Sequence, residues 1–497
     1  MNHLFKYGIP LSLGMILGTS AVERTAVAQD ADESAPPLTP AVFPDQPDDS
    51  RPAGENDGSE RNVLRESMAG AQYAADITLM TGIRPLFPLP EKTTDLNPWA
   101  PTPNPLNQSS PDALLGDPLE PLMRPIRNTE QWTQDNLGLT WNIYYTLLYQ
   151  GATRTVTDPA TGSDYGRNAG VGRLDLGFNW NIFDEPDVGH GQIGFLMRSG
   201  VVIGQPASYR MQTAIGSQPI GSDSLYWGNQ TSLCLLYWQQ GFLDDRIAFT
   251  VGKIHPNQYI MLSRIANDES RQFIGGPFDG LNTLGGSLGN YAPGMALQVV
   301  PMDGLYINAV VLDAAGGPNL GFDTIGDGNW WAAAQLGVVP EFDLANGQKL
   351  TGNWAVCLAG TNYGIVPTAN GFANGDANGL GFGVMIEQQI TRDLECMVQY
   401  GLSDAKLSPT EQTLNMVVSC LRPFDRKNDM AGIGLSWVKP SSIPTDSPRE
   451  EVFMEMFYRI QLTNSIQLTP DFQVLLQPRN GSSSPVCVFG LRLRTQF

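Results

Sequence analysis

The sequence predicts an all-β protein: a 16-stranded antiparallel transmembrane β-barrel preceded by a mostly disordered, proline-rich N-terminal arm. Three observations support this prediction. Short segments alternate apolar and polar side chains, and the gaps between them alternate between short and long. No stretch after residue 28 has the roughly 20 consecutive apolar residues of a membrane-spanning helix. Only a closed barrel crosses lipid without helices, because every backbone N–H and C=O group needs a hydrogen-bond partner there.

Residues 1–28 have the pattern of an export signal. A short segment containing Lys6 precedes the apolar stretch IPLSLGMILGTSA, and the small residues of Ala26-Val27-Ala28 stand directly before Gln29. This order matches the charged, apolar and cleavage regions of a secretory signal peptide. We therefore expect an exported protein.

Residues 29–129 predict a separate, acidic arm in the periplasm. The segment is crowded with Pro, Asp, Ser and Asn, as in PPLTPAVFPDQPDDS and NPWAPTPNPLNQSSPD. Such a composition buries too little apolar surface to offset the entropy of ordering the chain. One exception is residues 59–77, where Leu64, Met68, Ala71 and Ala75 would share one face of a short helix. A plug, an anchor to another envelope component and a plain spacer remain open as roles for the arm.

From residue 130 to residue 497 the pattern predicts strands. The segments with strand character are 137–149, 171–183, 190–203, 229–238, 246–253, 294–301, 304–313, 330–340, 350–360, 380–390, 393–403, 412–421, 429–438, 451–463, 465–476 and 486–497. Their number is even, as in bacterial single-chain barrels.

The lengths of the gaps give an independent indication. The gaps after even-numbered segments are short, and three of them read PMDG, ITRD and TNS. The gaps after odd-numbered segments are mostly longer and rich in Gly, Asn and Asp. Short periplasmic turns that alternate with longer external loops are typical of an outer-membrane barrel.

The two faces of the predicted strands differ in the way a barrel requires. In residues 451–463, Val452, Met454 and Ile460 share one side, whereas Glu455 and Arg459 share the other. One side would face lipid and the other a wet lumen. Aromatic residues at strand ends fit the two interfacial girdles of such a barrel: Trp141, Tyr149, Trp180, Trp437 and Tyr458.

The third external connection, residues 254–292, is the longest and is predicted to fold inward. Sixteen strands enclose a lumen too wide for wall side chains to fill, and long ordered loops are usually functional. This loop contains aromatic rings that could stack on a sugar: Tyr259, Phe273 and Phe278. It also contains charged groups that could bind hydroxyls: Arg264, Asp268, Glu269 and Arg271.

Charged residues of the wall should also point inward, because a charge at the bilayer midplane is costly. The period of two places these residues inward: Arg173, Asp175, Arg198, Glu387, Glu395, Glu455, Arg459, Arg492 and Arg494. Their signs are nearly balanced, whereas a dedicated anion channel would be dominated by Lys and Arg.

Two regions resemble the carbohydrate-selective porins, the OprB family. The first is LLYWQQGFLDDRIAFTVGKIHPNQYI, where a strand ending in Gly252-Lys253 leads into the large loop, followed by RQFIGGPF. The second is EVFMEMFYRIQLTNSIQLTPDFQVLLQP, which is similar to the strand pair before the final strand of that family. The long acidic arm and the middle of the chain have no counterpart in this resemblance.

The resemblance implies a 16-stranded channel through which mono- or disaccharides diffuse, with arginines and acids at its constriction. The residues we expect to bind substrate or form the constriction are Arg198, Lys253, Tyr259, Arg264, Asp268, Glu269, Arg271, Phe273, Glu455, Arg459 and Arg492. A general or anion-selective porin, and a barrel that tethers the envelope through its arm, remain as alternatives. The preferred sugar and the oligomeric state stay open.

The chain ends on Phe497, the last residue of an alternating strand that also carries Phe489 and Leu491. This ending resembles the signal by which outer-membrane barrels reach their assembly machinery. We therefore expect the protein in the outer membrane of a Gram-negative-type bacterium, in contact with lipid and with that machinery.

Other classes of protein fit poorly. The net charge of −20 disfavours nucleic acid as a partner. Five scattered cysteines without a CxxC pair predict neither a disulfide framework nor a metal site, and no cofactor is expected. After signal cleavage only His190 and His255 remain for acid–base chemistry, and neither has a Ser and an acid nearby in a recognisable arrangement, so an enzyme is not expected.

Overall fold

The computed structural model describes residues 113–115, 118–157, 162–185, 188–204, 210–217, 225–243, 245–285, 290–319, 321–343, 349–368, 371–443, 450–476 and 484–497. The predicted signal peptide, the predicted helix over 59–77 and most of the predicted arm lie outside these residues. Within them, no helix is both long enough and apolar enough to cross a membrane.

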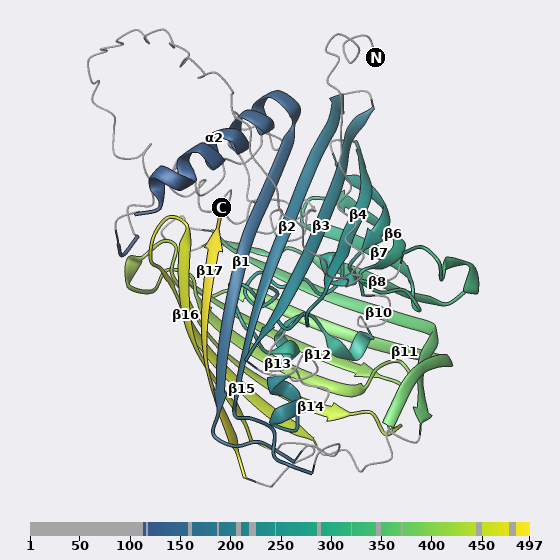
Figure 1. Cartoon of the computed structure of the whole chain (residues 1–497). Helices are drawn as coiled ribbons and strands as arrows, with labels where there is room; N and C mark the ends of the chain where they lie inside the picture. The colour runs from purple at the N-terminus through teal and green to yellow at the C-terminus, as the bar shows by residue number, and fades with distance from the viewer. Residues whose placement is uncertain are drawn as a thin grey trace, which may run out of the picture. The chain divides into compact units, whose positions relative to one another are not determined.

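One antiparallel sheet of 17 strands dominates the described chain (Figure 1). All strands except β9 (Glu341–Asp343) form a closed ring, because β1 pairs with β17 from Tyr144 opposite Gln496 to Ala152 opposite Val488. The strands of the ring are β1 (Leu139–Ala152), β2 (Asn168–Glu185), β3 (Gly189–Ile203), β4 (Thr231–Phe242), β5 (Ile247–Ile254), β6 (Ala292–Met302), β7 (Leu305–Asp313), β8 (Trp330–Val338), β10 (Lys349–Thr368), β11 (Gly371–Gln389), β12 (Leu394–Ser403), β13 (Thr410–Cys420), β14 (Met430–Pro440), β15 (Glu451–Gln461), β16 (Ile466–Leu475) and β17 (Val486–Gln496).

Each predicted strand overlaps one strand of this ring, so the prediction of a 16-stranded antiparallel barrel is confirmed. Closure leaves no unpaired edge. We call the end of the barrel where β1 starts the turn end, and the opposite end the loop end. Five of the seven connections at the turn end are short, such as the one from Met302 to Leu305.

The prediction of a long external gap over residues 361–379 was wrong. β10 and β11 continue through it as a long hairpin, paired up to Thr368 opposite Gly371. The segment is rich in Gly and Asn, which resembles a loop in sequence. A bulge at Tyr363 accommodates the irregularity. The other difference is β9, which forms a small extra ladder with β10 at the turn end.

The outer and inner faces of the strands alternate as the sequence predicts. On β15, Phe453, Glu455 and Phe457 are buried inside, whereas Met454 and Met456 lie on the outer face. On β17, Arg492 and Arg494 point inward and Leu491 lies outside. The wall charges expected to point inward are buried or nearly buried there.

The barrel is preceded by helix α2 (Glu120–Leu137), which the sequence did not predict. Gly138 ends it in a left-handed conformation (φ 66°), and its N–H donates to the carbonyl of Gln134 at 3.1 Å. The helix begins inside the predicted arm, where Pro121 and Pro125 disfavour a helix in the sequence. Pro121 in the first turn is compatible with a helix, because the first N–H groups have no intrahelical partner.

Two connections at the loop end turn into the barrel. The third, between β5 and β6, was expected to do so and carries η2 (Pro256–Gln258), η3 (Gly276–Phe278) and η4 (Asn282–Leu284). The second, between β3 and β4, also turns inward through α3 (Met211–Ala214), whose Met211 and Ala214 are fully buried. Ser217 of this connection donates to Glu451 on β15 at 3.3 Å.

Candidate functional site

The inner loop joins β5 to β6, and its described residues, 255–285 and 290–291, lie within the barrel and contact its wall at several places. Ile265, Phe273 and Phe278 of this loop are at most 1% exposed. Amides of the neighbouring strands β7 and β8 and of β13 hold its backbone: Asn308 on β7 donates to Tyr259 O, Gln335 on β8 accepts from Met261 N, and Asn415 on β13 donates to Pro277 O, each at 2.7 Å. The loop is therefore tied to two separate parts of the barrel wall.

An arginine cluster joins the loop to β2 and β3. Arg173 and Arg198 both contact Asp175 of the wall, at 2.8 and 2.7 Å. Both also contact one oxygen of the loop residue Glu269, at 2.7 and 3.2 Å. The two arginines are therefore balanced by two carboxylates, one from the wall and one from the loop.

Two aromatic rings cover the guanidinium of Arg198. It lies 5.5 Å from the ring centroids of both Trp227 and Tyr291, and its Nη1 donates to the Tyr291 hydroxyl at 2.5 Å. The two rings meet edge to face at 5.7 Å. The indole N–H of Trp227 has no acceptor among the described residues. We call Arg198, Glu269, Trp227 and Tyr291 the Arg198 site.

The charges of this site are fixed over a wide pH range. Burial opposes ionisation of Glu269, but the guanidinium groups of Arg173 and Arg198 outweigh it and lower the pKa of Glu269 to about 2. Burial, and then the charge of Arg198, lower the pKa of His255 to about 3. His255, whose ring is tilted against that of Tyr291 with the ring centroids 4.5 Å apart, is therefore uncharged near neutral pH.

Arg459 and Arg492 bind the loop through its backbone. Arg492 donates to the carbonyls of Glu269 and Gln272, at 2.7 and 2.8 Å. Arg459 donates to the carbonyl of Arg271 at 3.4 Å. Hydrogen bonds from these guanidinium groups to backbone carbonyls fix the position of the loop. Both residues therefore stabilise the segment that contains Glu269.

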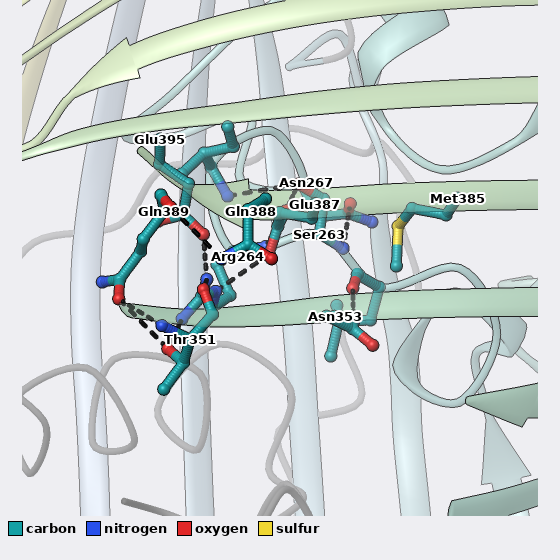
Figure 2. Close-up of polar contacts among 12 residues, drawn as sticks. Ser263, Arg264, Asn267, Thr351, Asn353, Met385, Glu387, Gln388, Gln389 and Glu395 are labelled. Atoms are coloured by element: carbon teal, nitrogen blue, oxygen red, sulfur yellow. Dashed lines mark hydrogen bonds and ion pairs between the residues drawn. The ribbon is translucent and has the colours of Figure 1, made fainter. Parts of the chain in front are cut away.

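A second charged cluster fastens the loop to β10, β11 and β12 (Figure 2). Arg264 Nε contacts Glu387 at 2.9 Å, and its Nη2 contacts Glu395. Ser263 Oγ and the backbone N–H of Arg264 also donate to Glu387, at 2.5 and 3.0 Å. Arg264 Nη1 reaches Thr351 Oγ1 at 3.3 Å. Arg264 is thus surrounded by wall groups and anchors the loop.

Glu455, on β15, holds the loop from another part of the wall. Its two carboxylate oxygens accept the backbone N–H groups of Ile274 and Gly275, at 2.6 and 2.7 Å. A carboxylate that receives two loop N–H groups secures the chain between Phe273 and η3.

The loop aromatics pack in the interior and do not present open faces. The ring of Phe273 lies tilted against that of Phe278, with centroids 4.7 Å apart, and meets Phe457 of β15 edge to face at 4.8 Å. Tyr259 and Phe273 are each 1% exposed. The structure therefore gives these rings a packing role in place of the sugar-stacking role expected from the sequence.

The remaining expected site residues lie in other surroundings. Asp268 accepts the N–H and hydroxyl of Ser270, at 2.9 and 2.7 Å, which stabilises the loop internally. Lys253, at the end of β5, donates to the carbonyl of Pro318 in the β7–β8 connection at 3.0 Å. Arg271 is half buried beside the carbonyl bound by Arg459.

Sequence reasoning did not include Trp227 and Tyr291 in the site. Both stand in connections, where no period of two predicts the direction of a side chain. Arg173 and Asp175 were expected to point inward but were not assigned to the site. Among the described residues, no group of His, Cys, Asp and Glu is arranged to hold a metal ion.

Comparisons with known proteins agree with the architecture. The family model described as carbohydrate-selective porin, OprB family, matches residues 199–497. The high-pH structure of Pseudomonas putida OprB has a TM-score of 0.57 at 14% identity, covering 74% of this chain and 96% of that chain. The low-pH structure of the same protein has a TM-score of 0.46 at 13% identity, covering 78% and 100%. No curated protein matches the chain in sequence.

Proposed function

Because the chain belongs to the carbohydrate-selective porins of the OprB family, we propose that it carries small neutral carbohydrates, mono- or disaccharides, by diffusion through a water-filled barrel. We propose that the Arg198 site binds the sugar within the lumen. A planar guanidinium and a carboxylate stand beside aromatic rings, which is the set of groups that a sugar engages with its hydroxyls and its C–H faces.

The Arg198 site has three features that suit a neutral polyol. Glu269 and Asp175 balance the charges of Arg173 and Arg198, so the site attracts neither sign strongly. The buried indole N–H of Trp227 lacks an acceptor in the described chain, and a sugar hydroxyl that reaches it can provide one. The arginine is already held in place, so binding requires little ordering.

The same proposal includes location and assembly. We place the barrel in the outer membrane of a Gram-negative-type bacterium, with its outer face in contact with lipid. Phe497 closes the seam, because its N–H donates to the carbonyl of Ile143 on β1 at 2.8 Å. We propose that this terminal aromatic is also the element read by the β-barrel assembly machinery.

Single-channel recording in planar bilayers tests the function. Glucose or maltose should reduce the current in a saturable manner. Trp227→Ala should raise the half-blocking concentration about tenfold, which corresponds to about 1.4 kcal/mol. Trp330→Ala, which removes an exposed indole at the start of β8, is the matched control and should change nothing.

Other outcomes would replace the proposal. Conduction without block by any sugar would indicate a general porin. A strong preference for chloride over potassium would indicate an anion channel. An unchanged sugar flux together with a leaking envelope, after deletion of residues 29–112, would favour a tethering barrel.

A further inference from the structure

The connection between β13 and β14, residues 421–429, presents an unusual side chain at the turn end. It contains η6 (Pro423–Asp425), and Phe424 within it is 87% exposed. This is the most exposed of the large apolar side chains in the described part of the chain. A ring in water is unfavourable, so its exposure calls for a partner.

The backbone at this position is also unusual. Phe424 has φ 60° and ψ 30°, and the following Asp425 has φ 60°. Two consecutive non-glycine residues in the left-handed region are costly and persist only where the surroundings enforce them. Here Arg426 donates to Asp429 at 2.5 Å, and the N–H of Asp425 donates to Arg422 O at 3.1 Å. These hydrogen bonds hold the turn in a conformation that exposes the ring of Phe424.

The ring lies beside the outer face of the barrel. Its centroid is 6.3 Å from that of Tyr458, an outer-face residue of β15. The hydroxyl of Tyr458 donates to Asp429 at 3.0 Å, which joins the turn to that face. Ile390, in the neighbouring β11–β12 turn, is 50% exposed. Phe424 therefore continues the apolar outer band to the rim of the barrel.

Charged side chains of both signs flank this apolar rim, among them the exposed Asp425 next to Phe424. Arg422 is ion-paired with Asp393 of the neighbouring turn, which holds the two turns together. Arg392 and Lys427 of these turns are exposed. The ion pairs Arg422–Asp393 and Arg426–Asp429 leave two exposed cations and the acidic Asp425 in these turns, and an exposed ring on a rim with such a cation excess fits the boundary where acyl chains meet phosphate groups.

We propose that residues 421–429, together with Arg392, form a lipid anchor that binds an anionic glycerophospholipid of the leaflet at the turn end. Phe424 and Tyr458 contact the upper part of its acyl chains. Arg392 and Lys427 contact its phosphate. This interaction fixes the depth of this side of the barrel and is independent of what passes through the lumen.

A fluorine probe tests the placement of the ring. The full chain carrying 4-trifluoromethylphenylalanine at position 424 is reconstituted into phosphatidylglycerol nanodiscs, and the ¹⁹F line width is measured. A nitroxide on the acyl chain should broaden the signal, and a gadolinium chelate in the water should not. The same probe at Phe489, on the outer face of β17, gives the lipid reference, and the probe at Phe322, in the β7–β8 connection, gives the water reference. If position 424 behaves like position 322, the ring is in water and the proposal is wrong.

A pair of charge variants tests the phosphate contact. The ¹⁹F shift of position 424 should differ between phosphatidylglycerol and phosphatidylcholine nanodiscs. Arg392→Gln combined with Lys427→Gln should abolish that difference. Arg246→Gln, at the β4–β5 turn, is the matched control and should preserve it. A difference that survives the double substitution would overturn the role of these two cations.

Discussion

The guanidinium of Arg198 contacts four neighbouring side chains. Nε contacts Asp175, Nη2 contacts Glu269 and Nη1 donates to Tyr291, while Trp227 lies within cation–π distance. A lysine has the same charge but no planar fork, so it cannot hold these partners together. The orientation of the group, and not its charge alone, should therefore determine how a sugar is bound.

Arg198→Lys tests this distinction. The charge of the lumen is unchanged, so the open-channel conductance should remain close to that of the parent. The half-blocking concentration of glucose should rise five- to tenfold, because the hydrogen-bond fork is lost. Planar-bilayer titrations measure both quantities, with Arg246→Lys at the turn end as control. An unchanged titration would separate Arg198 from sugar binding.

Glu269→Gln tests the charge balance of the site. The substitution leaves two arginines with Asp175 as their remaining acidic partner, so the lumen gains positive charge. Chloride should become more permeant than in the parent, seen as a shift of the reversal potential in a potassium chloride gradient. Glu341→Gln on β9, which pairs with Lys349 at the rim, should leave the potential unchanged.

The acidity of Glu269 also predicts a pH dependence. Its pKa in the folded protein, about 2, lies below the ordinary 4.5, so its ion pairs stabilise the loop fully above about pH 4.5 and are lost as the pH falls through about 2. The contribution of Glu269 to sugar block should therefore be lost only toward pH 2, whereas a change between pH 8 and pH 5 belongs to Asp279, whose pKa burial and then the charge of Glu269 raise to about 7. In Glu269→Gln that acidic decline should disappear. The absence of a decline between pH 5 and pH 2 would contradict the assignment.

The sequence predicted the direction of the residues on strands and failed for those in connections. Arg198, Glu455 and Arg492 were placed inward correctly, because a period of two fixes the face of each strand position. Trp227 and Tyr291 depend on how two connections meet inside the barrel. The rings of Tyr259 and Phe273 were expected to be accessible to a sugar, but they are buried. Both lie in a connection, where the residue type indicates what a ring can bind but not which residues cover it.

At the scale of elements, the inner loop owes its position to polar contacts from the wall. Amides and charged groups of β7, β8, β11, β13, β15 and β17 each bind its backbone. A segment with few regular hydrogen bonds of its own needs such partners, because buried N–H and C=O groups without them are costly. The wall therefore defines the conformation of the loop.

Glu455→Ala tests this dependence. The N–H groups of Ile274 and Gly275 would lose their acceptor, at about 1–3 kcal/mol for each buried group left without a partner. Amide hydrogen exchange over residues 270–280 should accelerate, and single-channel records should show more frequent fluctuations. Glu450→Ala is the control, because Glu450 is exposed and accepts from Trp437, outside the loop. Unchanged exchange would show that other contacts suffice.

The strands themselves were predictable, but two other elements were not. Alternation identifies a strand wherever its faces meet different surroundings, and this holds around the whole ring. Helix α2 was missed because prolines at 121 and 125 are typical of a spacer. The β10–β11 hairpin was cut short because glycines and asparagines there indicate a loop, although ladder pairing continues through them.

At the scale of the whole molecule, the barrel separates two environments with a single layer of chain. The same strand that presents Val398 outward presents Gln399 inward, and the first is 44% exposed whereas the second is fully buried. If the outer face is in lipid, a charge on it should be penalised according to its depth in the bilayer. If the outer face were in water, depth would have no meaning.

Two substitutions on the outer face of β12 measure this directly. Val398 lies near the middle of the strand, and Leu402 lies one residue from its end at the loop end. Val398→Arg should lower the free energy of unfolding in lipid vesicles by about 2–4 kcal/mol, and Leu402→Arg by about 0–1 kcal/mol, because the penalty falls toward the interface. Denaturant titrations of the reconstituted barrel measure both values, and heat-modifiable migration on gels checks that each variant has folded. Equal and small costs at the two positions would mean that the outer face does not lie in lipid, since only a bilayer distinguishes two exposed positions on one face by their depth.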